Sequence, residues 1–471
     1  MIRFKNKTKN TIYLEDLDRS IPYAGDHIQN LVLNDAKKSK AFQHFVEVGK
    51  FEIISSNKPS QLEKALQYRK VNYEKTMKEQ KDCEKSITIS DSNPVCVRGH
   101  IFDISGYGKV NRNLIFGLLR NGVNVCIDPT NRVKMQIGEK ETRILAGLQR
   151  KPDHRKTIFI DSMVPTFGMN ALGGYRILYT TVESTTIPKQ FRECLAFYNE
   201  IWVTSDFCKR VLEKDGVEQK IMVLPDSIDT DHYIDKGDLY YFDPPLKDFV
   251  FVSVFSWNYR KGYDALLKAY LQEFSGDDPV TLLLVSKHFH TPNKNKDIKK
   301  EVAEFIKRYG GSNPPHIARC SMMISESQMP SLYRTCNAYI SLTRGEGFGL
   351  TFCESALCGL PVIATDHSGQ TMFMNEKNST LVPIDGMRKV ESGMMNVHYW
   401  DGQYFADLTT KDFIREAGQS MRYVFEHQEE AKAKTKLLIA ELRENYSIDA
   451  VAKKAIARLN EIRSKNNAYF A

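Results

Sequence analysis

The stretch "AYISLTRGEGFGLTFCESALCGLPVIATD" (residues 338–366) decides how the rest of this chain is interpreted. Its first segment, "AYISLTR", has the continuous apolar character of a buried strand, and "LPVIAT" after Gly359 has the same character. Between them, "GEGFG" predicts a tight turn, and "LTFCESALC" predicts a helix that ends at Gly359. Strand, glycine loop, helix and strand in this order predict a parallel sheet with the loop at the carboxyl ends of its strands.

Two glutamates, Glu346 and Glu354, flank this loop and are expected to face one crevice. Glu354 lies in the first turns of the predicted helix, where side chains tilt back toward the helix N-terminus. The same geometry directs backbone N–H groups and the positive end of the helix toward the crevice, which favours anions and nucleotides. Because a buried carboxylate needs hydrogen-bond donors, and sugar hydroxyls supply donors in pairs, the pattern predicts a site for a nucleotide and a sugar.

The composition is that of a soluble globular protein with more than one domain. Its 471 residues are 42% hydrophobic and 26% charged, and this length predicts two or three domains. No apolar run approaches the roughly 20 residues of a membrane helix, and "MIRFKNKTKN" at the start has no apolar signal region. The nine cysteines, from Cys83 to Cys358, form no C-x-x-C pair, which predicts reduced thiols. We therefore expect a cytoplasmic protein.

The order of expected elements divides the chain into five segments. Residues 1–55 form a small accessory region with strand-like runs ("TIYLEDL", "KFEIISS") around a helical stretch near 35–48, and residues 56–92 form a charged helical linker. Alternating strands and helices predict a Rossmann-like N-terminal (acceptor) domain over 93–235 and a Rossmann-like C-terminal (donor) domain over 236–430. Residues 431–471 predict a helix that packs back across both domains. The predicted fold class is α/β, with two Rossmann-like domains facing across a cleft.

The segment "MPSLYRTCNAYISLTRGEGFGLTFCESALCGLPVIATDHSG" (329–369) resembles the retaining glycosyltransferases of family 4, which have the two-domain GT-B arrangement and an E-x7-E motif. The resemblance covers about residues 93–465. It implies a retaining transfer from a nucleoside-diphosphate sugar of UDP or GDP type, with no metal and no cofactor. It also implies that Glu346 contacts the transferred sugar and that Glu354 binds the ribose. The implied contacts to sugar and phosphates are the amides of Gly347, Phe348, Gly349 and Leu350.

A second segment, "FVSVFSWNYRKGYDALLKAY" (251–270), predicts a strand, a basic loop and an amphipathic helix. Arg260 and Lys261 immediately precede the expected helix, where a diphosphate would gain both the helix dipole and charge-assisted hydrogen bonds. The family has a basic pair here, and the resemblance implies that Lys261 stabilises the leaving group. Residues 256–258 lack the usual arginine, so Arg260 is its candidate substitute, and which cation contacts which phosphate stays open. The alternative is two solvated charges at a helix start.

Two further segments supply candidates from the N-terminal domain. "DISGYGKVNRN" (103–113) is a strand-to-helix glycine loop without the third glycine of G-x-G-x-x-G, because Asn111 stands there. The resemblance implies that this loop meets the donor phosphate or the acceptor through Ser105, Gly106, Tyr107 and Gly108. "YTTVESTTIPKQF" (179–191) resembles a sub-branch of the family that reads roughly "YTTWE…IP". Glu183 is implied to orient the acceptor hydroxyl or to stabilise positive charge at the anomeric carbon, and the alternative is an exposed strand-end glutamate.

Motifs of metal type are present but poorly placed. "DLD" (16–18) and "DTD" (229–231) match the D-x-D by which another glycosyltransferase fold holds manganese. Neither follows a core strand beside the glycine loops, so both are predicted to be turns. "HFH" (288–290) has no carboxylate nearby in sequence, which favours a polar surface. The sequence therefore predicts no metal site.

The sequence leaves the acceptor and several rival functions open. Net charge is +8, but no dense Lys/Arg block with aromatics adjoins Tyr107 or Glu183, so a glycan or protein acceptor is favoured over modified DNA. The first 55 residues resemble accessory β domains of phage-encoded proteins, either as an attachment or oligomerisation module or as a passive extension. Rival functions are a catalytically inactive binding or virion protein, a sugar-nucleotide epimerase and a pyridoxal phosphate phosphorylase. The oligomeric state is not determined.

Overall fold

A computed structural model describes residues 94–130, 137–150, 152–153, 156–165, 174–287, 297–320, 324–395 and 398–465, with five short strands between residues 2 and 53. The chain divides into two compact units, Met1–Thr88 and Ile89–Ala471. The predicted helical stretch near 35–48 and the predicted linker at 56–92 lie outside the described residues.

The described part of the first unit consists of short antiparallel strands. β1 (Ile2–Asn6) lies between β4 (Gln29–Leu31) and β5 (Phe51–Ile53), and β2 (Ile12–Leu14) pairs with β3 (Arg19–Ile21). The sequence pattern predicts β2 and β5 but not the other three strands. β1, with the sequence IRFKN, and β3, with the sequence RSI, contain mostly polar residues, so they show no apolar run of the kind that marks β2 and β5.

The second unit begins with a six-stranded parallel sheet in the order β11-β10-β9-β8-β6-β7. Its strands are β6 (Val95–Gly99), β7 (Val125–Pro129), β8 (Ile158–Ser162), β9 (Tyr175–Thr180), β10 (Glu200–Val203) and β11 (Lys220–Val223). Its helices are α4 (Gly106–Arg120), α5 (Glu139–Gly147), α6 (Lys189–Leu195) and α7 (Asp206–Lys214). Most strand residues are buried and apolar because helices cover the sheet, whereas the edge strand β11 has no fully buried residue. This is the N-terminal domain below.

A second parallel sheet follows in the order β14-β13-β12-β15-β16-β17 and forms the C-terminal domain. Its strands are β12 (Phe249–Ser256), β13 (Val280–Lys287), β14 (His316–Cys320), β15 (Ala338–Ser341), β16 (Val362–Thr365) and β17 (Thr380–Val382). Its helices are α8 (Tyr263–Glu273), α9 (Ile298–Tyr309), α10 (Met329–Arg334) and α11 (Leu350–Leu357), with short 3-10 turns η1 (Tyr259–Lys261), η2 (Glu326–Gln328) and η3 (Gly369–Met372). The strand order reverses between β12 and β15, which leaves a crevice at their carboxyl ends.

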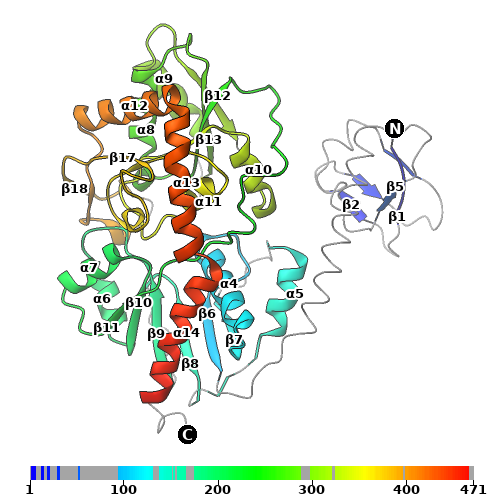
Figure 1. The fold of residues 1–471 in the computed structure, drawn as a ribbon, viewed down its shortest axis with the longest axis vertical. Helices are drawn as coiled ribbons and strands as arrows, with labels where there is room; N and C mark the ends of the chain where they lie inside the picture. The colour runs from blue at the N-terminus through cyan, green and yellow to red at the C-terminus, as the bar shows by residue number, and fades with distance from the viewer. Residues whose placement is uncertain are drawn as a thin grey trace. The chain divides into compact units, whose positions relative to one another are not determined.

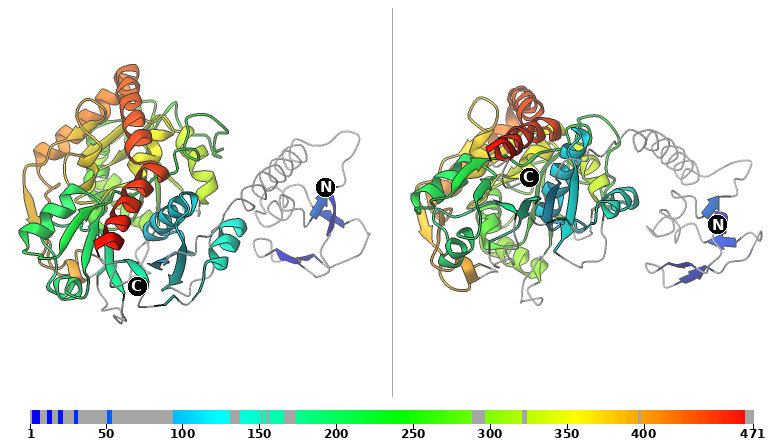
Figure 2. Two further views of the ribbon diagram at one scale, coloured as in Figure 1. Left: turned by 60° about the horizontal axis from the view of Figure 1, so that its bottom comes forward. Right: turned by 90° about the horizontal axis from the view of Figure 1, so that it is seen from below.

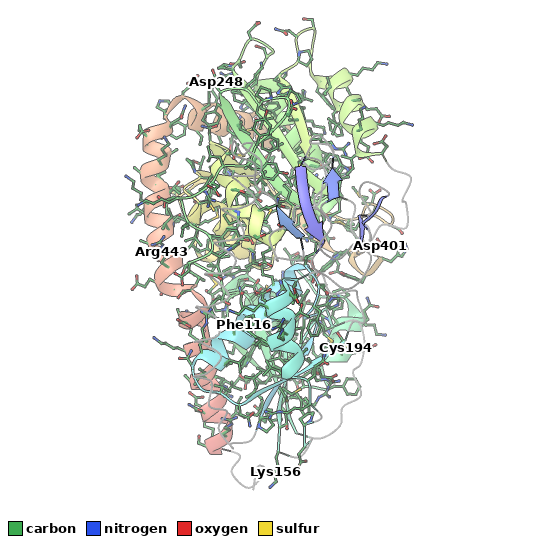
Figure 3. All side chains as sticks on the ribbon, turned by 90° about the vertical axis from the view of Figure 1, so that its right-hand side faces the viewer. Phe116, Lys156, Cys194, Asp248, Asp401 and Arg443 are labelled. Carbon is green, nitrogen blue, oxygen red and sulfur yellow. The ribbon has the colours of Figure 1, made fainter. Side chains whose placement is uncertain are left out.

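The carboxyl ends of the two sheets point toward each other. Asp248 immediately precedes β12 and Lys156 lies two residues before β8, and Figure 3 shows these two residues at opposite outer ends of the molecule. Both sheets therefore start at the outside, and their strands run toward the middle. The loops that follow the strands of the two domains meet there, as the predicted fold class requires.

The C-terminal segment crosses from one domain to the other along one side of the molecule (Figure 1). α12 (Lys411–Glu426) and α13 (Gln428–Asn445) pack on the C-terminal domain, whereas α14 (Ile448–Lys465) packs against α4 of the N-terminal domain. The views in Figure 2 agree on this position of α14. The sequence predicts a long helix with breaks near 410–465, and one break follows α13, where the Ile228 N–H donates to the Tyr446 carbonyl at 2.9 Å. None of the described helices has the length and apolar content of a membrane span.

A hairpin that the sequence does not predict also joins the domains. β18 (Met387–Lys389) and β19 (Tyr404–Ala406) enclose a loop with the turn η4 (His398–Trp400), all within the C-terminal domain's chain segment. Trp400 packs edge-on against Phe191 of α6, with ring centroids 5.9 Å apart. The Thr185 N–H donates to the Tyr404 carbonyl at 3.1 Å. Apolar burial and backbone pairing therefore hold the two domains in contact at this side of the cleft.

Candidate active site

The glycine loop after β15 touches the N-terminal domain directly. A Cβ at Gly347 would lie 1.3 Å from Thr181 Oγ1, and one at Gly345 would lie 2.0 Å from the Glu183 carbonyl oxygen. The Thr204 hydroxyl donates to the Gly347 carbonyl at 3.0 Å. At Gly349, which caps α11, φ is +106°, a value that side-chain-bearing residues rarely adopt. Glycine is therefore required here for close approach and for the turn, as the sequence predicts.

A cavity of about 500 Å³ lies between the two domains. Of the predicted site residues, it is lined by Ser105, Gly106, Tyr107, Glu183, Arg260, Lys261, Glu346, Gly347, Phe348, Gly349, Leu350 and Glu354. Only Gly108 among them is absent from the lining. Its amide donates to Ser105 Oγ at 3.1 Å, and a Cβ there would lie 2.5 Å from the Asp103 carbonyl oxygen. Gly108 therefore shapes the start of α4 and does not face the cavity.

Glu346 lies at the centre of a buried cluster of charges. Its Oε1 is 2.5 Å from Lys261 Nζ and accepts from the Thr343 hydroxyl at 2.9 Å, while its Oε2 is 3.2 Å from Arg260 Nη1. Burial by itself raises the pKa of Glu346, but Lys261 and Arg260 outweigh burial and lower it to about 2. Burial in turn lowers the pKa of Lys261. The carboxylate is thus firmly ionised, and the lysine charge depends on its anionic neighbours.

Arg260 joins Glu346 to Glu183 of the opposite domain. Its Nη2 is 3.0 Å from Glu183 Oε1, and its Nη1 also donates to the Gly345 carbonyl at 2.6 Å. Burial raises the pKa of Glu183, and Arg260 only partly offsets this effect. Two alternatives from the sequence are therefore wrong: Arg260 and Lys261 are not solvated charges, and Glu183 is not an exposed strand-end glutamate. Gly262, with φ of +66°, holds this basic turn against β15.

Glu354 is held by residues that the sequence analysis misses. Its Oε1 is 2.5 Å from Lys109 Nζ of α4, and its Oε2 accepts from the Tyr333 hydroxyl at 3.1 Å. Lys109 also donates to the Tyr233 hydroxyl at 2.7 Å and lies 3.3 Å from Glu326 Oε1. The available signal was the polar run "KVNRN" at the start of an otherwise apolar helix, and all five of its residues are buried. No local pattern could have paired it with a glutamate 245 positions away.

The N-terminal domain contributes a second set of polar groups to the cavity wall. Ser105 caps α4, and its backbone N–H donates to Asp103 Oδ1 at 2.9 Å. Asp226, another residue that the sequence analysis misses, accepts from the Tyr179 hydroxyl at 3.0 Å and lines the cavity. Burial raises the pKa of Asp226 to about 7, although the Tyr179 hydroxyl opposes the change. Hydroxyls and carboxyls of this kind suit a polar, hydroxyl-bearing ligand.

Of the motifs of metal type, only residues 229–231 are described by the structure. Asp229 Oδ1 accepts from the backbone N–H groups of Asp231 and His232 at 3.1 and 3.0 Å, so this D-x-D is a turn, as predicted. Residues 16–18 and 288–290 lie outside the described residues. Within the part of the chain that is described, no group of three His, Cys, Asp or Glu side chains could hold a metal ion. The eight described cysteines are free and buried, as predicted.

Comparison with known proteins identifies the class of fold. Residues 247–394 match the family model for glycosyl transferases group 1. The sucrose-phosphate synthase of Thermosynechococcus elongatus is similar with a TM-score of 0.58, over 79% of this chain and 100% of that one, at 14% identity. Anabaena HepE, in a complex with UDP and glucose, is similar with a TM-score of 0.55, over 78% of this chain and 100% of that one, at 12% identity. The chain thus has the GT-B fold of these glycosyltransferases, and its residues 247–394 resemble a group 1 glycosyl transferase domain.

Relatives by sequence cover shorter segments. A stretch of 143 residues, 28% of this chain, is 32% identical to sucrose synthase 2 of Oryza sativa subsp. japonica and covers 17% of that protein. The chain spans about a fifth of the length of the curated relatives that it matches. The similarity therefore identifies a shared domain, and activity, substrates and partners are treated as proposals below.

Proposed function

We propose that this protein is a retaining, metal-independent glycosyltransferase that moves a sugar from a nucleoside-diphosphate sugar to a hydroxyl acceptor. One observation carries the proposal. Two carboxylates and two cations, Glu183, Arg260, Lys261 and Glu346, meet where the loops of the two domains close over one cavity, and Glu354 lines the same cavity. In the GT-B relative named above, the bound molecules are UDP and glucose, which supports a donor of UDP type.

The donor would lie against the C-terminal domain. Glu354 would accept hydrogen bonds from the ribose diol, and the amides of residues 347–350 would face the sugar and phosphates. The diphosphate would replace Glu346 as the principal partner of Lys261 and Arg260, and its negative charge would favour the protonated lysine. Stabilisation of the leaving phosphate by these cations and by helix N-termini would substitute for a metal ion.

Transfer would proceed on one face of the sugar. The acceptor oxygen forms its bond to the anomeric carbon on the side from which the phosphate oxygen departs, and the acceptor proton passes to that phosphate oxygen. Glu346 would contact the transferred sugar, and Glu183, from the opposite wall, would orient the acceptor hydroxyl or stabilise positive charge at the anomeric carbon. Closed domain contacts such as Thr204 to Gly347 would exclude water and so limit donor hydrolysis.

The donor is found first by thermal stabilisation with a panel of UDP and GDP sugars, because binding to the folded state raises its stability by mass action. Release of the nucleoside diphosphate then reports turnover, and the anomeric proton signals of donor and product report stereochemistry. An α-configured donor should give an α-linked product. An inverted product refutes the retaining proposal. If the sugar nucleotide binds but is not turned over with any glycan or protein acceptor, the protein is an inactive binding protein. If the sugar of the nucleotide is converted to its epimer, the protein is an epimerase.

For the acceptor, we propose a glycan or a protein. The cavity wall of the N-terminal domain presents hydroxyls, the carboxyls of Glu183 and Asp226, and Lys109, whose charge is paired with Glu354, so the described part of this wall offers no free cation to a polyanion. A modified-DNA acceptor would instead give binding that falls steeply with salt, because each phosphate contact releases counterions. Acceptor binding should be measured between about 50 and 200 mM salt. Over this range the affinity for DNA should fall about a hundredfold or more, and this fall separates DNA from a glycan or protein acceptor.

A further inference from the structure

The ion pair between Lys109 and Glu354 spans the cleft and contains almost no exposed surface. Lys109 is 8% exposed and Glu354 is 6% exposed, and they belong to α4 and α11 of opposite domains. Burying both charges costs desolvation free energy, and only good geometry and complete hydrogen bonding offset this cost. Neither residue belongs to the apolar cores, and both line the cavity. The position of the pair in the cavity wall indicates a role in ligand binding.

The ammonium of Lys109 has no hydrogen-bonding capacity left for a phosphate. It has three donors, and three partners surround it: Glu354 at 2.5 Å, the Tyr233 hydroxyl at 2.7 Å and Glu326 at 3.3 Å. Glu326 is itself held by Arg112 at 3.1 Å. Burial lowers the pKa of Lys109, but Glu354, Tyr233 and Glu326 outweigh it, so the pKa is raised and the charge is secure. Lys109 is therefore fixed in place rather than poised for a ligand.

Glu354, in contrast, has capacity to spare. A carboxylate offers about four acceptor positions, and the described residues occupy two of them, Lys109 on Oε1 and Tyr333 on Oε2. Two remain, one for each hydroxyl of a ribose diol. In this buried place Lys109 is the only cation within ion-pair distance of Glu354 among the described residues.

We propose that Lys109 is a positioning residue for the donor nucleotide, which holds the Glu354 carboxylate in place and aimed at the ribose and does so only when the two domains are closed. This rests on the proposed function, in which Glu354 binds the ribose. Ribose recognition by the C-terminal domain is then completed by a residue of the N-terminal domain, and closure and nucleotide binding favour each other.

The groups that face Glu354 decide what removal of Lys109 does. Besides Lys109, they are Tyr233, Glu326 and, through Glu326, Arg112, with Tyr333 and Tyr339 from the C-terminal domain. Burial raises the pKa of every one of these tyrosines, so they stay neutral. Burial also raises the pKa values of the Cys353 and Cys358 thiols on the same helix. In Lys109→Met, Glu354 therefore loses the one cation that lies within ion-pair distance of it among the described residues, and none of these neutral neighbours replaces that cation.

The test compares the affinities of UDP and 2′-deoxy-UDP by calorimetry on the full chain. The wild type should bind UDP about tenfold more tightly or better, because one hydrogen bond to a charged group is lost with the 2′-hydroxyl. Lys109→Met should lose most of this preference, and Lys109→Arg should retain more of it. Because Lys109 is proposed to act through Glu354, the double variant Lys109→Met/Glu354→Gln should lose no more of the preference than Glu354→Gln alone. Lys261→Met should weaken both nucleotides alike, and the exposed Lys377→Met should change nothing.

Each outcome has one meaning. If Lys109→Met keeps the wild-type preference, or weakens the binding of both nucleotides by the same factor, Lys109 does not act through Glu354 and the inference is wrong. If the wild type shows no preference, or Glu354→Gln keeps it, the ribose contact of the proposed function is what fails. Circular dichroism checks folding, and Lys109→Gln, whose polar side chain is as long as that of methionine, replaces Lys109→Met if that variant does not fold.

Discussion

Replacement of Lys261 by methionine separates the two roles that its charge has in this structure. Without a ligand, Lys261 is the nearer of the two cations that hold Glu346 ionised, at 2.5 Å against 3.2 Å for Arg260. With a donor bound, the same charge is proposed to bind the diphosphate. Methionine keeps most of the length and apolar volume of the lysine stem, so the substitution removes mainly the charge.

The magnitude follows from the pKa of Glu346. Lys261 and Arg260 together with local hydrogen bonds lower it from 4.5 to about 2, a difference of about 2.5 that corresponds to roughly 3 kcal/mol. Because the folded pKa lies below the unfolded one, this stabilisation is present above about pH 4.5 and is lost as pH falls toward 2. In Lys261→Met the pKa of Glu346 should move back up, so less stability should be lost over this range.

Two measurements check the prediction. Calorimetry should show UDP binding about 10–100-fold more weakly in Lys261→Met, since one charge-assisted hydrogen bond to the diphosphate is lost, with little change for uridine. Urea unfolding, followed by tryptophan fluorescence at pH 7 and at pH 3.5, should show a smaller acid destabilisation than in the wild type. Exposed Lys377→Met is the matched control. Unchanged UDP affinity in a folded Lys261→Met protein would refute the phosphate assignment.

Three further predictions concern the metal, the loop and the N-terminal unit. Turnover should be unchanged in EDTA. A strict manganese requirement would refute the metal-independent proposal and would make residues 16–18 and 229–231 candidate metal ligands. Gly347→Ala should cost at least about 1–3 kcal/mol of stability and most of the activity, because its Cβ would overlap Thr181 of the opposite domain. Thr181→Gly in the same chain should restore part of the stability and part of the activity. If it restores neither, the overlap with Thr181 is not the cause. Deletion of residues 1–85 should leave donor binding intact, since every proposed donor contact lies beyond residue 100, while transfer to a macromolecular acceptor is the activity at risk; loss of UDP affinity in the folded truncation would make the N-terminal unit part of the catalytic unit.

The sequence by itself determined the features that depend on local order along the chain. Alternating buried strands and helices predicted both parallel sheets, because a parallel connection needs a crossover and the crossover is usually a helix. The glycine loop at 345–349 placed Glu346 and Glu354 in one cavity, since a strand, a turn and a helix start fix the directions of both side chains. The basic turn with Arg260 and Lys261 was found in the same way, from its place between a strand and a helix.

Only the tertiary structure decided which charges meet. Lys109 and Glu354 are 245 positions apart, and Arg260 and Glu183 belong to different domains, so no spacing in the sequence links them. The short strands β18 and β19 were missed because three residues carry no period, yet their loop brings Trp400 against Phe191 and joins the domains. Ion pairs and apolar contacts act over a few ångströms in space whatever the separation along the chain, and the closed arrangement of the two domains alone sets those distances.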